Sequence, residues 1–296
     1  MLIQCPLDEQ LAPHVKELIG IGADEFYLGY RNRLKFSEQI LSRRSGIFPN
    51  FISTASTADA IRCVKENSKK VFVAINETFY PPAYIKQILV DIAKLRENGV
   101  DGFIIADVNL FLQIQESFPD LHLVASTVAH IFNSKALDFF KNLGAKRCIM
   151  PRQLTISEIK EIINNNQDME FEIFIKNDEC FNIDGICAYS HFDTHADPPA
   201  CRHIERMCGI SETDRASCGV CSLYDLKDLP NLILKIVGRG KSFEWIKNDV
   251  NFVKRVLLFM DQANTKEEFI GFCKKEYLAI YRNPCRERCY YTYGHK

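Results

Sequence analysis

Short runs of β-branched and aromatic residues alternate with amphipathic segments along most of this 296-residue sequence. The alternation is typical of βα units, in which helices join parallel strands. Strands are predicted at residues 2–5, 25–28, 71–75, 102–106, 121–125, 147–150, 170–175 and 232–237. Eight strands separated by helical connections predict an α/β fold, a (β/α)8 TIM-like barrel, and barrels commonly reach this length as one domain.

Capping residues indicate where the connecting helices begin. Thr155 opens a capping-box pattern, Ser134 is predicted to cap another helix, and Ser56 or Thr57 a third. Helices are expected at residues 9–19, 56–67, 83–98, 109–118, 134–143, 155–164, 243–260 and 267–281. Residues 30–50 are polar, basic and poorly periodic, which predicts a long loop, and long loops at strand ends tend to carry function.

Polar or ionisable side chains directly follow most of the predicted strands. In a (β/α)8 barrel the carboxyl ends of the strands meet at one rim, where catalytic groups sit. The rim residues are Asn76, Asp107, Ser126, Thr127, Arg152, Lys176, Asn177 and Arg239. Each could instead be a turn former or a helix cap. Together they predict a functional site around the barrel mouth.

Chemical roles follow from the side-chain types. Catalytic roles are predicted for Asp107, Asn76 and Arg152, and substrate-binding roles for Lys235, Arg239, Asn177 and Thr127. The cations would hold anionic groups of a substrate, arginine through bidentate geometry, unless they form structural ion pairs at the rim. The amides and Asp107 would orient the substrate or carry a proton.

Half of the twelve cysteines fall within one stretch, at Cys180, Cys187, Cys201, Cys208, Cys218 and Cys221. A disulfide framework, a structural zinc site and an iron–sulfur cluster would each explain such a stretch. Among these six, only Cys218 and Cys221 have the Cys-x2-Cys spacing that is usual for zinc, and irregular spacing suits a cluster bound by loop thiolates. Other cysteines, such as Cys63, Cys148 and Cys273, fit the pattern of ordinary buried residues.

Composition narrows the functional classes. The formal net charge is -1, so no global field favours nucleic acid or an anionic membrane. No apolar run approaches the ~20 residues that cross a bilayer. The first residues show no secretory signal, so a cytoplasmic, reducing location and no membrane partner are expected.

Two regions are predicted along the chain. Residues 1–262 would form the barrel, with a metal-binding insertion at 177–230 after the seventh strand, and 263–296 a short helical tail. The tail carries Cys285 and Cys289 in a Cys-x3-Cys pattern. This pair could extend the metal site, bind a metal separately, or remain free.

Glu172-Ile173-Phe174 followed by Cys180-x4-Gly185-x-Cys187-x2-Ser190 resembles the signature of the collagenase-like peptidase family, peptidase family U32. Companion segments occur in the same order as in that family. They include Gly22-Ala23-Asp24, Gly99-Val100-Asp101-Gly102, Leu143-Gly144-Ala145 and Lys235-Ile236-Val237-Gly238-Arg239. The resemblance covers about residues 8–257.

The resemblance implies a barrel, a [4Fe–4S] cluster and, in similar members, oxygen-independent hydroxylation with prephenate as the implied oxygen donor. The implied substrates are the ubiquinone ring, a tRNA uridine or a ribosomal RNA cytidine, and other members are linked to collagen breakdown. The implied cluster ligands are Cys180, Cys187, Cys201 and Cys221, with Cys208 and Cys218 as alternates.

The sequence departs from the family pattern at Gln153 and Val237, where relatives carry acidic residues, and at Val128. Lost carboxylates remove candidates for acid–base work. Three hypotheses follow: an iron–sulfur hydroxylation enzyme or a subunit of one acting on an RNA base or a small aromatic or other organic substrate; a peptidase; or a non-catalytic cluster-binding partner of a homologous subunit. For an RNA substrate, a basic patch could come from Arg31, Arg33, Lys35, Arg43 and Arg44.

Overall fold

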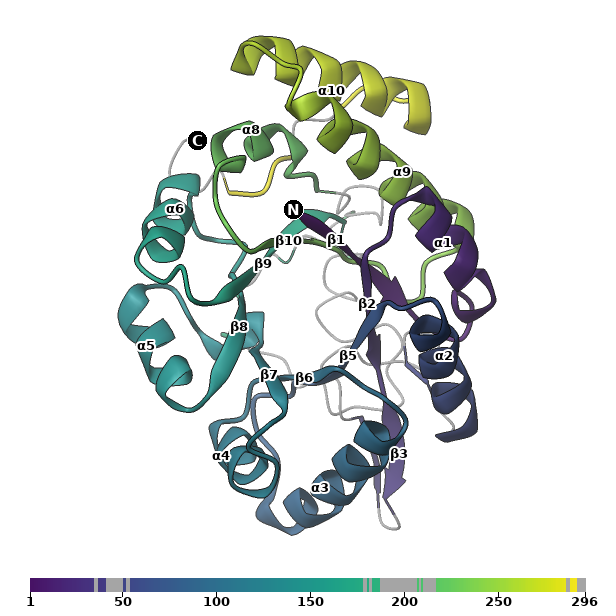
Figure 1. The fold of residues 1–296 in the computed structure, drawn as a ribbon, viewed down its shortest axis with the longest axis vertical. Helices are drawn as coiled ribbons and strands as arrows, with labels where there is room; N and C mark the ends of the chain where they lie inside the picture. The colour runs from purple at the N-terminus through teal and green to yellow at the C-terminus, as the bar shows by residue number, and fades with distance from the viewer. Residues whose placement is uncertain are drawn as a thin grey trace.

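The computed structural model describes residues 1–34, 37–40, 50–51, 54–177, 180, 183–186, 207, 209, 217–285 and 288–291. Eight parallel strands close into a barrel in the order β1-β10-β9-β8-β7-β6-β5-β2, which confirms the predicted fold (Figure 1). The strands are β1 (Leu2–Leu7), β2 (Glu25–Gly29), β5 (Lys70–Ile75), β6 (Gly102–Ile105), β7 (His122–Ala125), β8 (Ala145–Ile149), β9 (Glu170–Lys176) and β10 (Leu232–Ile236).

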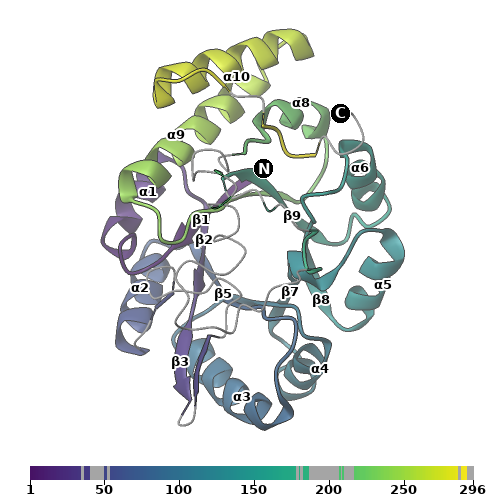
Figure 2. The ribbon, with the colours of Figure 1, turned by 180° about the vertical axis from the view of Figure 1, so that it is seen from behind.

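Helices surround the barrel (Figure 2). They are α1 (Val15–Ile21), α2 (Thr54–Glu66), α3 (Pro82–Glu97), α4 (Val108–Ser117), α5 (Ser134–Asn142), α6 (Ile156–Asn164), α8 (Leu223–Leu226), α9 (Phe243–Met260) and α10 (Lys266–Tyr281). Short 3-10 turns occur at η1 (Ala12–His14), η2 (Thr127–Ala129) and η4 (Val220–Ser222). Helix α10 lies outside α9, so this side of the barrel carries two helical layers.

Several predicted boundaries were wrong. The helix predicted to begin at Ser134 is capped one residue earlier, because the Asn133 side chain accepts a hydrogen bond from the Ala136 amide at 3.0 Å. Helix α2 begins at Thr54, before the predicted caps Ser56 and Thr57. The predicted loop over residues 30–50 contains an antiparallel pair, β3 (Arg31–Leu34) and β4 (Ser37–Ile40). The sequence of this segment shows little alternation of apolar and polar residues, and strand prediction depends on that alternation.

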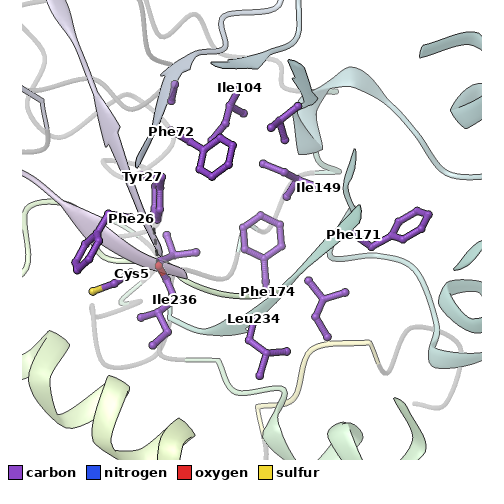
Figure 3. Packing of buried hydrophobic residues seen from close by; sticks show 14 of the residues in the cluster. Cys5, Phe26, Tyr27, Phe72, Ile104, Ile149, Phe171, Phe174, Leu234 and Ile236 are labelled. Atoms are coloured by element: carbon purple, nitrogen blue, oxygen red, sulfur yellow. Dashed lines mark hydrogen bonds between the residues drawn. The ribbon is translucent and has the colours of Figure 1, made fainter. Parts of the chain in front are cut away.

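Alternation along the strands divides the apolar side chains between two layers (Figure 3). Phe72 and Phe174 point into the barrel, whereas Phe26 and Phe171 point outward toward the helices. All four side chains are buried. A filled barrel interior means that the fold is a packed core and that ligands must bind at its ends or on its outside.

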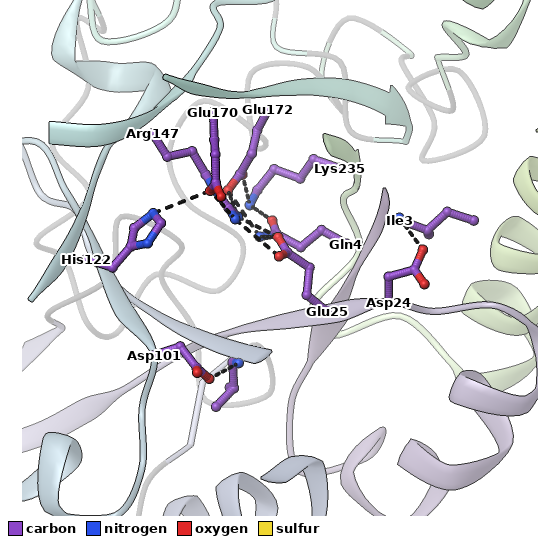
Figure 4. Close-up of polar contacts among 11 residues, drawn as sticks. Ile3, Gln4, Asp24, Glu25, Asp101, His122, Arg147, Glu170, Glu172 and Lys235 are labelled. Carbon is purple, nitrogen blue, oxygen red and sulfur yellow. Dashed lines mark hydrogen bonds and ion pairs between the residues drawn. The ribbon is translucent and has the colours of Figure 1, made fainter. Parts of the chain in front are cut away.

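A network of charged side chains occupies part of the barrel interior (Figure 4). The Arg147 guanidinium contacts Glu25 at 2.5 Å, Glu170 at 2.6 Å and Glu172 at 3.0 Å. Lys235 donates to Glu172 at 2.8 Å, and the Gln4 amide donates to Glu25 at 2.8 Å. Burial raises the pKa of Glu172, but the nearby Lys235 and Arg147 charges outweigh burial and lower it. The network therefore ties β1, β2, β8, β9 and β10 together through charges that compensate one another.

Replacing Arg147 with methionine should lower the free energy of unfolding by about 3–5 kcal/mol, because it leaves buried carboxylates without their cation. Denaturant titration measures this change. Lys135→Met is the matched control, since Lys135 is 94% exposed and its loss should cost less than about 1 kcal/mol. Equal stability of the two variants would show that the interior network contributes no net stability.

Candidate active site at the barrel mouth

Asp184 ties the cysteine segment, the stretch from residue 180 to residue 221, to the barrel rim. Its carboxylate accepts from the Thr127 hydroxyl at 3.0 Å, from the Arg152 backbone amide at 2.9 Å and from the Arg152 guanidinium at 2.6 Å. The Asp184 amide donates to the Gln153 side chain at 3.2 Å. Because Asp184 lies between the motif residues Cys180 and Cys187, these contacts fix the start of the cysteine segment against the ends of β7 and β8.

The glycine of the motif is required by its surroundings. Gly185 has a φ of 85°, a conformation that side chains other than glycine rarely adopt. A Cβ atom at Gly185 would lie 2.2 Å from the His130 ring and 2.6 Å from the Val128 carbonyl oxygen. The close contact holds the turn after Asp184 against the residues that follow β7.

Arg152 is the cation at the centre of this part of the mouth. Its guanidinium lies 3.7 Å from the ring centroid of Phe174, and the Cys180 thiol is near enough to influence the pKa of Arg152. Burial favours the neutral form, but Asp184 outweighs burial and raises the pKa of Arg152, so the group is a permanent cation. In the described part of the chain, the buried Nε of Arg152 has no hydrogen-bond partner. This N–H is a donor that a bound anion or acceptor could use.

Two further cations, Lys235 and Arg239, lie near Tyr27. Tyr27 is on β2, which is opposite β8 in the closed order of strands. The Lys235 ammonium is 3.7 Å from the Tyr27 ring centroid and also donates to Gln4 and Glu172. Arg239 donates to the Asn50 side chain at 3.2 Å and lies 5.6 Å from the same ring. Lys235 therefore joins the interior network, whereas Arg239 remains at the carboxyl end of the strands.

Gly29 at the end of β2 makes room for Arg239. A Cβ atom at this position would lie 1.8 Å from Arg239 Nη1 and 2.1 Å from Asn50 Oδ1. Any larger residue would displace the guanidinium from the rim.

The remaining predicted residues have local structural partners. Asn76 donates to Ser126 at 3.2 Å. Asp107 caps α4 by accepting from the Leu110 amide at 2.7 Å, and its second oxygen accepts from the Tyr80 amide at 2.9 Å. Asp107 also lines an open cavity of about 530 Å³ between α4 and α5.

Asn177 faces α9 and away from the mouth. Its amide donates to Asp249 at 2.5 Å and to the Val237 carbonyl at 3.0 Å, and its oxygen accepts from Trp245 at 3.2 Å. The structure therefore brings Thr127 and Arg152 together through Asp184, but it turns Asn177 toward the helical layer.

The cysteines of the segment and the tail have different neighbours in the described regions. Cys180 is within electrostatic range of Arg152, whereas Cys221 is hydrogen-bonded with Cys273 and lies near Cys218. Cys218 also pairs with Cys289 in a β-bridge and lies near Cys285. Burial raises the pKa of the Cys218 thiol to about 12. Predicted ligands Cys187 and Cys201, and the alternate Cys208, lie outside the described residues.

Within the described ranges, no three histidine, cysteine or carboxylate side chains are placed to hold a metal ion. Among the same residues, no helix has the length and apolar character needed to cross a membrane. The four-cysteine ligand set therefore stays a prediction, as do the boundaries at 177–230 and 263–296.

A sequence model of peptidase family U32 matches residues 12–295, so the chain belongs to this family, and the resemblance predicted from the cysteine motif is confirmed. A solved structure of a U32 peptidase superposes with a TM-score of 0.57 over 80% of this chain and 93% of that chain. Its sequence identity is 13%, so this likeness supports the barrel fold alone.

Curated relatives include proteins that modify RNA. The tRNA hydroxylation protein P of Escherichia coli is 32% identical over 130 residues, 44% of this chain and 28% of that protein. The 23S rRNA 5-hydroxycytidine C2501 synthase of Escherichia coli is 24% identical over 229 residues, 69% and 33% of the two chains. An uncharacterized protease of Methanocaldococcus jannaschii is 30% identical over 194 residues, 63% and 44%. The matched stretch spans less than a third of the tRNA hydroxylation protein.

Replacing Asp184 with alanine should lower the free energy of unfolding by about 3 kcal/mol, because the Arg152 guanidinium loses its buried partner. The double variant Arg152→Met with Asp184→Leu should be less destabilised than Asp184→Ala, since it buries no unpaired charge. Denaturant titration measures both, with Asp138→Ala at an exposed ion pair as control. If Asp184→Ala unfolds like the control, Asp184 does not anchor the segment.

Proposed function

We propose that this protein takes part in the hydroxylation of an RNA base. The observation that carries the proposal is the anchoring of the cysteine segment at the barrel mouth, where Asp184 holds the Arg152 guanidinium within electrostatic range of Cys180. Support comes from the relatives whose names describe hydroxylation of tRNA and hydroxycytidine synthesis in 23S rRNA. The matched stretch spans 28% of the tRNA hydroxylation protein of Escherichia coli, and a homologous partner subunit is part of the proposal.

Cys180, Cys187, Cys201 and Cys221 are proposed to bind a [4Fe–4S] cluster. The donor chemistry at the mouth fits a thiolate-bound cluster in one respect: the permanently charged Arg152 guanidinium is within electrostatic range of Cys180 and would offset the negative charge of thiolate ligands. When bound, such a cluster supplies one-electron redox chemistry. The variant Cys180→Ser tests whether Cys180 is one of the cluster ligands.

The side chains of the mouth would bind and orient the substrates. Arg152 and Arg239 offer guanidinium donors to phosphate or carboxylate groups, which they can engage in bidentate fashion. The unused Nε–H of Arg152 is one such donor. Asn76, which follows β5, and Thr127, which follows β7, would orient the base by hydrogen bonding. Prephenate, whose carboxylates match these cations, is proposed as the oxygen donor.

Protein purified without oxygen should contain about four irons and four acid-labile sulfides per chain. Cys180→Ser should lose most of both, whereas Cys63→Ser in α2 should retain them. Elemental analysis and the visible spectrum measure the result. Stoichiometric zinc, or iron retained in Cys180→Ser, would contradict the cluster assignment.

Deleting the gene should remove one hydroxylated nucleoside from cellular RNA, which mass spectrometry of digested tRNA and ribosomal RNA detects. The wild-type gene should restore the nucleoside, and Cys180→Ser should not. An unchanged set of modified nucleosides in the deletion strain would overturn the RNA proposal and leave a small organic substrate or a peptide as the alternatives.

A further inference from the structure

A second cavity lies outside the barrel, away from the interior network. Its volume is about 420 Å³, within the range typical of small-molecule sites. The end of β9, both α9 and α10, and the returning tail enclose it. Side chains lining it include Lys176, Trp245, Tyr277, Ile280, Tyr281 and Arg288.

A β-bulge directs Lys176 toward this cavity. Phe174 pairs with Lys235, but Lys176 pairs with the next residue of β10, Ile236, so Ile175 is an extra residue in β9. A bulge of this kind reverses the side-chain alternation and re-aims the following residue. Phe174 consequently points into the barrel, whereas Lys176 extends between α9 and α10.

The Lys176 ammonium is buried but incompletely paired. Its side chain is 1% exposed, and the carboxylate of Asp249 lies 3.8 Å away, beyond hydrogen-bond distance. Asp249 instead accepts from Tyr281 and Asn177, each at 2.5 Å. No oxygen within the described regions accepts a hydrogen bond from this ammonium. An ammonium beside the Asp249 carboxylate is a cation and not a free amine nucleophile.

Aromatic rings surround the ammonium. The ring centroids of Tyr281, Tyr277 and Phe252 lie 4.5, 5.0 and 5.9 Å from Lys176 Nζ. These rings, with Ile280 and Trp245, give the cavity flat apolar walls beside the buried Lys176 cation, and Arg288 adds a second, half-buried cation. The cations favour an anion, and flat walls favour a ring. Glu244 also borders the cavity, but its side chain is 72% exposed and thus well solvated.

We infer that this cavity binds a small carboxylate carried on a flat or aromatic ring, with Lys176 contacting the carboxylate and the aromatic walls contacting the ring. Among the described residues this buried ammonium has only the longer contact to Asp249, and such a ligand would offset its desolvation cost by hydrogen bonding. The inference does not depend on RNA hydroxylation, since ligand binding is measured on the purified protein without RNA.

Trp245 is the single tryptophan of the chain, so its fluorescence reports directly on the cavity. Phenylacetate, benzoate and phenylpyruvate, titrated to about 10 mM, should give a saturable change for at least one compound. Phenylacetamide, the uncharged analogue of phenylacetate, should bind at least about tenfold more weakly than the carboxylate. The double variant Lys176→Met with Asp249→Asn, which buries no unpaired charge, should show a similar loss. Lys247→Met, at an exposed position of α9, should bind like the wild type.

Three results would overturn the inference. The first is no saturable change with any of the three carboxylates, and the second is equal binding of phenylacetamide and phenylacetate. The third is loss of bound iron from the double variant Lys176→Met with Asp249→Asn, which would assign the cavity to the cluster. If the double variant fails to fold, the comparison of amide and carboxylate on the wild-type protein still decides the question.

Discussion

The guanidinium of Arg147 is the group around which the charged interior of this barrel is arranged. It contacts three carboxylates from β2 and β9, and Lys235 and Gln4 extend the same network to β10 and β1. Charges taken out of water are tolerated only when each finds a partner. The network therefore constrains the register of neighbouring strands, because a shift of one residue would move its members to the outer face. A fixed register in turn fixes where each strand ends at the mouth.

The mouth uses the same principle on a smaller scale. Asp184 pairs with Arg152 and accepts from Thr127, so one buried carboxylate joins the cysteine segment to two strand ends. Around the outside, the bulge at Ile175 turns the next cation away from the mouth and toward α9 and α10. Neighbouring residues of one strand thus serve two separate regions: Phe174 packs under Arg152, and Lys176 enters the outer cavity.

The strands were predictable because buried parallel strands leave continuous apolar runs, and the capping box at Thr155 was predictable from two residues alone. Asn133 and Ser134 are both good helix caps, so only the backbone geometry decides between them. The interior network was not predicted, because Glu25 and Arg147 within strands resemble solvent-facing residues until the barrel closes. Asp184 could have been suspected from the turn glycine beside it. The outward direction of Lys176 depends on a bulge that leaves no signal in the sequence.

The mouth is the proposed place where an RNA base is hydroxylated, with Arg152 as its central cation. The most direct measurement is nucleoside mass spectrometry of RNA from a deletion strain that carries either the wild-type gene or Arg152→Met combined with Asp184→Leu. This pair of substitutions removes the mouth cation without leaving a buried charge. The account predicts that the wild type restores the hydroxylated nucleoside and that the folded double variant does not. Full restoration by the double variant would contradict it.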